Sequence, residues 1–276
     1  MTDEKRKLQM LILSIAEDVT TICDENNIEY FMDGGTQLGA VRHKGYIPWD
    51  DDFDLAMKRE DYDRFLRICE MNLDKNKYFL QTEGTENNYC FSFAKIQLKG
   101  TEILEDFSKN VDIQHGIFID VFPYDNLPDN KIARKLFLTE NHILKNLLWT
   151  KCGYGADWQK KKKSYIFFKL IGKCISIDRL KKLRDSHIRK FNNKRTKMLF
   201  NSDYPKNHLN NELFSKRKKY DFEDKVFWGF WNSNEFLTAL YGSTYMELPP
   251  EEKRVQHSHY LSLIHISEPT RQAEIS

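Results

Sequence analysis

Long apolar runs are absent from this 276-residue sequence. The longest candidate, Ser164–Ile177, is interrupted by Lys169 and Lys173, and it stays below the run of about 18 apolar residues that a transmembrane helix needs. The first 20 residues predict a charged amphipathic helix, in contrast to the apolar core of a signal peptide. We therefore expect a cytoplasmic protein whose membrane contact, if any, is peripheral and at the inner face.

Cysteine is scarce, and no two cysteines form a Cys-x-x-Cys pair. The five residues are scattered along the chain: Cys23, Cys69, Cys90, Cys152 and Cys174. Their odd number and wide spacing argue against a zinc site and against a disulfide framework. The sequence therefore predicts a protein of a reducing compartment.

Net charge is also small, at +2, but it is distributed unevenly. The segment Lys131–Lys219 has 25 Lys and Arg against 6 Asp and Glu, a net charge of +19, and the rest of the chain carries −17. This asymmetry predicts an anionic partner, either a polyanionic acceptor or an anionic membrane face. The run Lys160–Lys163 also fits a simple solvated loop. A non-enzymatic nucleic-acid-binding protein is an alternative, but interleaved aromatic residues are missing, so no nucleic acid is expected.

Apolar periodicity predicts an α/β (α+β) protein with a mixed sheet. The expected helices cover residues 3–26, 36–41, 58–69, 131–150 and 178–199. The expected strands cover residues 28–32, 52–57, 78–81, 89–96, 102–107 and 116–123. We expect a single catalytic domain with a core of residues 1–130 and 220–260 and a helical basic subdomain of residues 131–219.

A glycine turn follows the first expected strand. Gly34 and Gly35 allow the close backbone approach that a bound phosphate needs, and Thr36 is expected to cap the short helix behind them. Most such turns bind nothing. This one gains significance from the carboxylates that follow it.

Those carboxylates are Asp50, Asp52 and Asp54, which share one face of an extended strand. Like charges at this spacing repel each other unless a cation lies among them. Hard oxygen ligands suit Mg²⁺, with Mn²⁺ as the alternative, and such ions bridge to substrate phosphates. An acidic solvated loop is the competing interpretation.

A further carboxylate interrupts the apolar strand at residues 116–123. Asp120 is costly to bury there unless it is paired. It is either hydrogen-bonded for structural reasons, or it faces the site and completes the carboxylate cluster. We expect the second arrangement.

Taken together, residues 34–54 resemble the signature of LicD family phosphocholine transferases, with fukutin-type proteins as more distant relatives. Three further blocks fit, at residues 93–96, 116–125 and 241–257, so the resemblance covers almost all of residues 5–257. It implies a nucleotidyltransferase-like fold. It also implies transfer of phosphocholine from CDP-choline to a cell-surface glycan or its lipid-linked precursor, of the teichoic acid, lipopolysaccharide or capsule type. A nucleotidyltransferase that uses an NTP donor is the alternative enzyme class.

The resemblance also assigns roles to the acidic residues. It implies that Asp52, Asp54 and Asp120 are both metal ligands and catalytic residues, with Asp50 beside them. Metal ions at such a site activate the acceptor hydroxyl and stabilise the leaving phosphate. Asp120 is also a candidate to accept the hydroxyl proton.

The remaining assignments concern substrate binding. The implied residues are Gly34, Gly35, Thr36, Arg42, Lys44, Lys95, Arg254 and His257. The first three would hold the donor phosphates, and the cations would neutralise charge. The adjacent histidines usual in the family appear here as His257 and His259, separated by one residue. Tyr46 and Trp49 are aromatic candidates for a base or a quaternary ammonium, although packing is the commoner role.

The last residues look foreign to the rest of the chain. Leu261–Arg271 resembles an in-frame translation of a transposase sequencing adaptor, and residues 272–276 would continue it. We therefore expect residues 261–276 to be non-native and any genuine residues after about Tyr260 to be missing.

Overall fold

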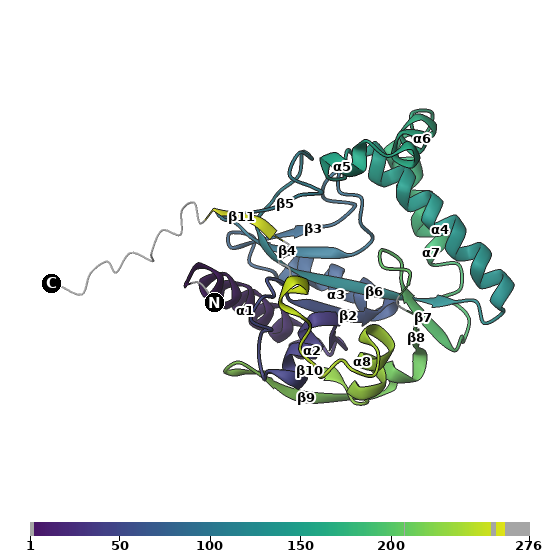
Figure 1. Ribbon diagram of the computed structural model, residues 1–276. Coiled ribbons are helices and arrows are strands. Elements are labelled where there is room, and N and C mark those ends of the chain that lie inside the picture. The colour runs from purple at the N-terminus through teal and green to yellow at the C-terminus, as the bar shows by residue number, and fades with distance from the viewer. Residues whose placement is uncertain (1–2, 207, 255–257, 263–276) are drawn as a thin grey trace.

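The computed structural model describes residues 3–206, 208–254 and 258–262. A mixed sheet forms the centre of the molecule, and helices lie against both of its faces (Figure 1). This architecture confirms the predicted α/β (α+β) class with a nucleotidyltransferase-like mixed sheet. No helix in the described ranges is long and apolar enough to cross a membrane.

The central sheet is organised around its longest described strand, β6 (Ile117–Leu127). Beside it lie β2 (Asp54–Lys58) in parallel and β4 (Ala94–Leu98) in antiparallel orientation. The sheet continues to β1 (Phe31–Met32) beyond β2 and to β3 (Tyr78–Gln81) beyond β4. The carboxyl-terminal half of β6 pairs with β7 (Met198–Asn201), which pairs with β8 (His208–Asn210). Strand β6 therefore fixes the positions of side chains on three neighbouring strands, β2, β4 and β7.

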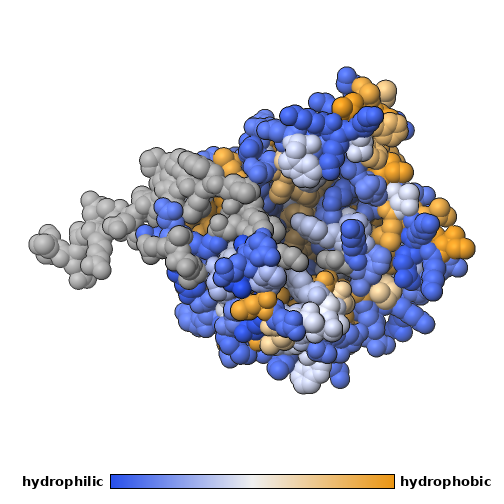
Figure 2. Space-filling model, in the orientation of Figure 1, coloured by the Kyte–Doolittle hydropathy of each residue, from blue (hydrophilic) through white to orange (hydrophobic). Residues whose placement is uncertain are grey.

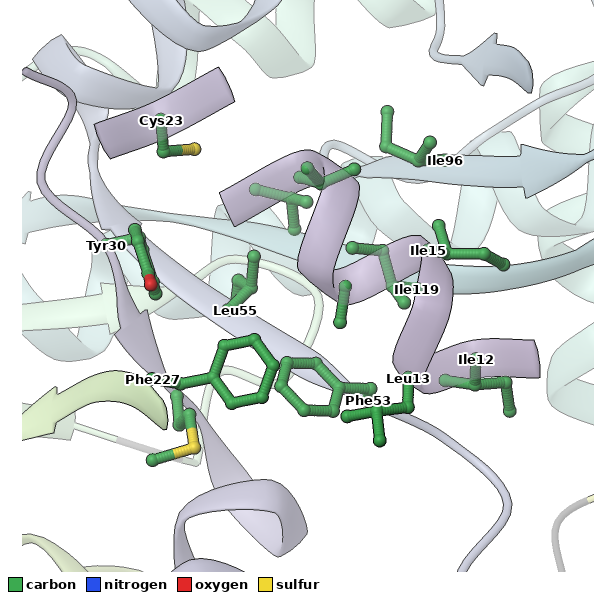
Figure 3. Packing of buried hydrophobic residues seen from close by; sticks show 14 of the residues in the cluster. Ile12, Leu13, Ile15, Cys23, Tyr30, Phe53, Leu55, Ile96, Ile119 and Phe227 are labelled. Atoms are coloured by element: carbon green, nitrogen blue, oxygen red, sulfur yellow. The ribbon is translucent and has the colours of Figure 1, made fainter. Parts of the chain in front are cut away.

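One face of the sheet is covered by α1 (Asp3–Glu25) and α3 (Arg59–Asn72). The apolar positions of α1 recur at helical spacing, so the helix presents one apolar face. Figure 3 shows Ile12 and Ile15 of this helix beside Ile119 of β6 and Ile96 of β4. These side chains are at most 1% exposed, so this side of the sheet serves stability and carries no polar site.

Two further groups of elements lie around the sheet. A helical group contains α4 (Lys131–Lys151), α5 (Asp157–Lys160), α6 (Lys163–Gly172) and α7 (Ile177–Ile188). A second group contains α2 (Gly34–Arg42), the hairpin β9 (Arg217–Phe222) and β10 (Lys225–Phe230), α8 (Ser233–Tyr241), and the short 3-10 helices η1 (Asn211–Ser215) and η2 (Glu251–Lys253). Figure 1 shows the first group above the sheet and the second below it. Buried residues of both groups join one core with Phe122 and Tyr124 of β6.

Three predicted boundaries are wrong for identifiable reasons. Strand β2 begins at Asp54, so residues 50–53 form a loop and do not share a strand face. The strand expected at residues 89–96 begins only at Ala94, because the preceding aromatic residues fill the core instead of pairing. The helix expected to reach residue 199 ends at Ile188. Beyond it, the Asn192 side chain hydrogen-bonds both Asp125 and the backbone N–H of Asn126, which replaces the helical ladder.

A small second sheet involves the segment predicted to be foreign. β5 (Glu102–Glu105) pairs with β11 (Ser258–Ser262), so Leu261 and Ser262 lie opposite Ile103 and Glu102. Residues 263–276 lie outside the described residues. The non-native origin of residues 261–276 stays a prediction.

Candidate active site

A cleft with a volume of about 800 Å³ opens on the sheet face opposite α1. Its floor comes from β2 and β6, one wall from the start of α2, and the facing wall from residues 241–250. The acidic side chains that line it are Asp33, Asp50, Asp51, Asp52, Asp54, Glu105, Asp120 and Glu247. The cleft therefore concentrates negative charge in one concave space.

Two predicted metal ligands are direct neighbours on the floor of this cleft. Asp54, the first residue of β2, lies opposite Asp120 in the parallel pairing with β6. The backbone N–H of Asp120 donates to the carbonyl of Phe53, at 3.0 Å, which fixes the register. Opposed residues of neighbouring strands point to the same face, so both carboxylates project into the cleft. Asp52 reaches the same cleft from the preceding loop.

Lys95 is the cation that contacts this pair of carboxylates, through Asp120, within the described residues. It lies opposite Asp120 on β4, with its Nζ atom 3.2 Å from Asp120 Oδ1 and 3.6 Å from Glu105 Oε2. The ammonium also lies over the ring of Phe118, 3.1 Å from its centroid. Its side chain is buried, and it does not line the cleft directly. The positive charge of Lys95 therefore offsets part of the negative charge of Asp120 from outside the cleft.

The negative charge that Lys95 does not offset raises the proton affinity of Asp52, Asp54 and Asp120. Burial raises the pKa of Asp52 well above its ordinary value, and the charges of Asp50, Asp51 and Asp120 add to this shift. Burial likewise raises the pKa of Asp54, with Asp52 and Asp120 as the largest charge contributions. The pKa of Asp120 rises to about 7 because burial outweighs the attraction of Lys95. The carboxylates therefore lack sufficient positive charge when all of them are ionised.

Asp33, which the sequence analysis did not single out, caps α2. Its Oδ1 atom accepts a hydrogen bond from the backbone N–H of Gly34 at 2.8 Å, and its Oδ2 atom accepts one from the hydroxyl of Tyr124 at 2.9 Å. Burial raises the pKa of Asp33 to about 6 even with these two donors. The predicted cap, Thr36, lies inside the helix, and its hydroxyl accepts from the backbone N–H of Asp54 at 2.8 Å. Thr36 thus joins the helix to the carboxylate strand, and its assignment as the cap is wrong.

The two glycines leave space where a side chain would intrude. Gly34 has φ +46, in the left-handed region, and a Cβ atom there would lie 3.4 Å from Asp54 Oδ2. A Cβ atom on Gly35 would lie 2.7 Å from Asp50 Oδ2, closer than real Cβ contacts. Both glycines line the cleft at the start of a nine-residue helix. The backbone can therefore approach a ligand here as closely as the sequence analysis expected.

The predicted cations are placed differently from one another. Arg42 lines the cleft, but its guanidinium donates to the carbonyls of Tyr245, at 2.8 Å, and Glu247, at 3.0 Å. Lys44 is exposed and does not line the cleft. Arg254 donates to the carbonyl of Pro249 and lies over the ring of Trp49, 5.1 Å from its centroid. Arg42 and Arg254 therefore bind the C-terminal wall of the cleft more directly than they face the carboxylates.

The remaining predicted residues are His257, Trp49 and Tyr46. His257 lies outside the described residues. Trp49 lines the cleft, whereas Tyr46 packs in the core against Phe53 and Phe222 and serves stability. The structure thus brings together the carboxylates, the glycines, Arg42 and Trp49 around the cleft, whereas Thr36, Lys44, Lys95 and Arg254 do not line it.

The sequence analysis also missed Asn201 and Tyr204, which line the cleft from the end of β7. Their segment is held by a buried ion pair in which Arg184 of α7 donates to Asp203 Oδ1 at 2.6 Å. Asn141 of α4 donates to the carbonyl of Ser202 at 2.9 Å. The helical group therefore positions one rim of the cleft. The sequence feature that bears on this rim is Arg184 in an amphipathic helix. The sequence alone does not show that this arginine is buried.

The residues present fit a hard divalent cation by their chemistry. No three His, Cys, Asp or Glu side chains within the described ranges are already drawn together as a metal site. Three carboxylates nevertheless face one cleft, and the Oδ1 atom of Asp120 accepts no hydrogen bond among the described residues, although it forms an ion pair with Lys95. Mutual repulsion raises the pKa of Asp52 and Asp54 in addition to burial. Oxygen donors with surplus negative charge are what Mg²⁺ or Mn²⁺ requires.

Comparison with known proteins agrees with this geometry. A lipopolysaccharide cholinephosphotransferase LicD from Haemophilus influenzae is 29% identical over 260 residues, which cover 91% of this chain and 95% of that protein. Ribitol 5-phosphate transferase FKRP from Homo sapiens is 41% identical over 46 residues, 17% of this chain and 9% of FKRP. An uncharacterized protein from Rickettsia typhi is 42% identical over 65 residues, 24% of this chain and 20% of that protein.

A family model described as LicD/FKTN/FKRP, nucleotidyltransferase domain, matches residues 27–167. The matched region contains the glycine turn, the aspartates of the cleft floor and Lys95. The predicted resemblance is confirmed, and so is the enzyme class that came with it. This chain belongs to the LicD/FKTN/FKRP family and is a transferase of the LicD type.

Proposed function

We propose that this protein transfers phosphocholine from CDP-choline to a hydroxyl group of a cell-surface glycan or its lipid-linked precursor. The observation that carries the proposal is the pairing of Asp54 with Asp120 on the floor of a cleft beside the glycine turn. The aligned relative named as a lipopolysaccharide cholinephosphotransferase supports the choice of phosphocholine. We place the reaction in the cytoplasm, before the glycan is exported.

Asp52, Asp54 and Asp120 would hold Mg²⁺ or Mn²⁺ in this proposal. A bound cation of this kind neutralises phosphate charge and lowers the pKa of a coordinated hydroxyl. The chain itself contributes positioning, because the glycine turn leaves room for the donor phosphates at the N-terminus of α2. Lys95 limits the excess negative charge around Asp120 before any substrate binds.

The reaction requires in-line placement and no covalent enzyme intermediate. The acceptor oxygen forms a bond to the phosphorus that carries choline, while the bond from that phosphorus to the oxygen of CMP breaks. The leaving CMP takes the electron pair of the broken bond. The acceptor hydroxyl loses its proton, and we assign Asp120 to accept it because this residue projects into the cleft.

Aromatic residues supply a site for the choline group. Phe107, Phe122 and Tyr204 line the cleft that contains the carboxylates, as do Trp49 and Phe118, whose rings already contact Arg254 and Lys95. A quaternary ammonium is attracted by the faces of such rings. Both donors carry a base that can stack on these rings, and CDP-choline also carries a quaternary ammonium group that they can bind.

Product analysis tests the proposal. The purified protein is incubated with CDP-choline, Mg²⁺ and a lipopolysaccharide or teichoic acid acceptor, and the products are identified by mass spectrometry. We expect CMP and an acceptor heavier by one phosphocholine group. We expect Asp54→Asn to reduce this transfer by at least about a hundredfold, since it removes a charge at the reacting centre. Asp224→Asn is the matched control, because Asp224 is exposed and does not line the cleft.

Two outcomes would contradict the proposal. Attachment of a nucleotide to the acceptor, with release of pyrophosphate from an NTP, would show a nucleotidyltransferase instead. Near-normal phosphocholine transfer by Asp54→Asn at limiting Mg²⁺ would show that the metal assignment is wrong.

A further inference from the structure

Helix α6 is apolar on the face that it turns away from the protein. Its inner side is fixed by Tyr165, which is buried, and by Phe168, which packs against the core. Gly172 follows at the same helical spacing, and its carbonyl accepts a hydrogen bond from Lys151 at 2.8 Å. A solvated helix should be polar on the remaining face.

That outer face instead carries four large apolar side chains, Ile166, Phe167, Leu170 and Ile171, which are 48%, 58%, 56% and 43% exposed. Trp158 of the adjacent α5 is 62% exposed. We call these five residues the α5–α6 surface. Figure 2 shows the orange side chains gathered over α6 and continuing along α4. Isolated exposed apolar residues are common, but a contiguous group on one helix indicates a binding surface.

Lysines lie before, within and after this apolar group along the chain. Lys160–Lys163 connect α5 to α6, while Lys169 and Lys173 lie on and just after α6. From Asp157 to Lys173 the chain has six lysines and a single acidic residue. The Nζ atom of Lys162 lies over the ring of Trp158, 4.4 Å from its centroid, so an aromatic and a cationic group share one position. Apolar side chains with cations on the same segment complement an anionic lipid surface, which offers acyl chains beneath negative headgroups.

We infer that the α5–α6 surface docks this protein onto an anionic membrane face. The apolar side chains enter the boundary between headgroups and acyl chains, and the lysines contact the headgroup phosphates. A soluble polyanion would account for the lysines but would leave the five apolar side chains in water. A partner protein with an apolar groove would account for the apolar side chains but not for the six cations.

The surface is rigidly connected to the rim of the cleft. Gly155, just before α5, donates its backbone N–H to the carbonyl of Phe107 at 2.7 Å, and Phe107 lines the cleft. The rings of Phe107 and Trp149 of α4 stack with their centroids 5.6 Å apart. A docked protein would therefore hold its cleft at a fixed orientation to the membrane. The docking itself does not depend on the proposed function.

Vesicle sedimentation tests the inference with the full chain. Vesicles of phosphatidylcholine alone are compared with vesicles that also contain phosphatidylglycerol, at low and at high NaCl. We expect binding only to the anionic vesicles, weakened at least tenfold by high salt because exposed charges are screened. Each lysine near such a surface contributes about a fivefold change in affinity. Replacing Lys160–Lys163 by glutamine should therefore weaken binding at least tenfold.

Trp158→Ala and Trp231→Ala form a matched pair, because both tryptophans are 62% exposed and Trp231 lies outside this surface, directly after β10. We expect Trp158→Ala to weaken vesicle binding about tenfold, as a large apolar side chain no longer leaves water. Trp231→Ala should bind as the wild type does. Quenching of tryptophan fluorescence by brominated lipids should be reduced in the first variant only.

Several outcomes would overturn the inference. One is equal binding to neutral and anionic vesicles, or no vesicle binding at all. Another is unchanged vesicle binding by Trp158→Ala, which would show that the apolar side chains do not enter the lipid. A dimer in solution that is dispersed by Phe167→Ser would assign the surface to a second copy of the chain. Tight binding of inorganic polyphosphate without vesicle binding would assign it to a soluble polyanion.

Discussion

Two of the regions in which the described residues bury charged side chains compensate them in opposite ways. Around Asp203, behind the cleft rim, the fully buried Arg184 donates to the Asp203 carboxylate and, at 2.8 Å, to the carbonyl of Cys90. The backbone N–H of Ser92 donates to the other carboxylate oxygen at 2.9 Å. Burial alone would raise the pKa of Asp203, but Arg184 and Lys145 lower it below its ordinary value.

On the cleft floor the carboxylates outnumber the nearby cations. Burial and mutual repulsion raise the pKa of both Asp52 and Asp54, and Lys95 offsets only part of the charge at Asp120. A buried charge with a partner stabilises the arrangement around it, whereas an uncompensated charge destabilises the protein until a ligand arrives. The first region is therefore structural, and the second is the region that we propose binds a cation.

The largest expected difference comes from removing one charge in each region. Arg184→Met leaves Asp203 buried without its arginine, so the free energy of unfolding should fall by about 3–5 kcal/mol. Asp54→Asn removes a repulsive charge, so the same quantity should stay constant or rise in metal-free buffer. Urea unfolding monitored by circular dichroism measures both. A loss of stability in Asp54→Asn as large as that in Arg184→Met would remove the distinction between the regions.

The next effect concerns pH and the α2 cap. The pKa of Asp33 is raised to about 6 in the folded protein, so the folded state holds this proton more tightly than the unfolded chain does. Stability from this group is present at low pH and is lost as the pH rises through about 6. Asp33→Asn should therefore gain about 2–3 kcal/mol relative to wild type between about pH 4 and pH 7.

Asp203 should show the opposite sign, which makes it the comparison for this experiment. Its pKa is lowered, so its contribution is lost as the pH falls. Urea unfolding at a series of pH values, with chelator present, measures both slopes. A stability difference between Asp33→Asn and wild type that is independent of pH would contradict the assignment.

A smaller effect is expected at the glycine turn. The Cβ atom of Gly35→Ala would lie 2.7 Å from Asp50 Oδ2, so the Asp50 side chain must turn away. Alanine favours the helix more than glycine does, and displacing the Asp50 side chain costs a similar free energy. We therefore expect little change in the free energy of unfolding. Transfer of phosphocholine should fall about tenfold or more, because the new methyl group occupies the cleft. Gly172→Ala in α6 is the matched control: its nearest contact is 3.5 Å, so we expect unchanged transfer and a stability equal to or slightly above wild type.

The smallest expected effect tests the connection between α2 and β2. Thr36→Val keeps the shape of the side chain but leaves the backbone N–H of Asp54 without its acceptor. We expect a loss of about 1 kcal/mol in stability. Thr21→Val is the control, since its exposed hydroxyl bonds only within α1. Equal effects of the two substitutions would show that the Thr36 contact has no special role.

Local patterns predicted the features that local chemistry determines. The apolar spacing of α1 and the lone Asp120 within an apolar strand were visible in the sequence, and the strand placed that carboxylate beside Asp54. The Asp33 cap was missed because Thr36 is equally good as a capping residue by type. Asn201 and Tyr204 were missed because their position depends on Arg184, which belongs to another helix.

Arg42 has a consequence for how the enzyme is made. Its guanidinium joins the end of α2 to the carbonyls of Tyr245 and Glu247, about two hundred residues later in the chain. A nascent chain that has not yet reached residue 241 can already pair Asp54 with Asp120, but it lacks the facing wall of the cleft. During synthesis the carboxylates should therefore remain open to water and to stray metal ions until this late segment emerges. The wall that faces the carboxylates is complete only after residue 250 has been added to the chain.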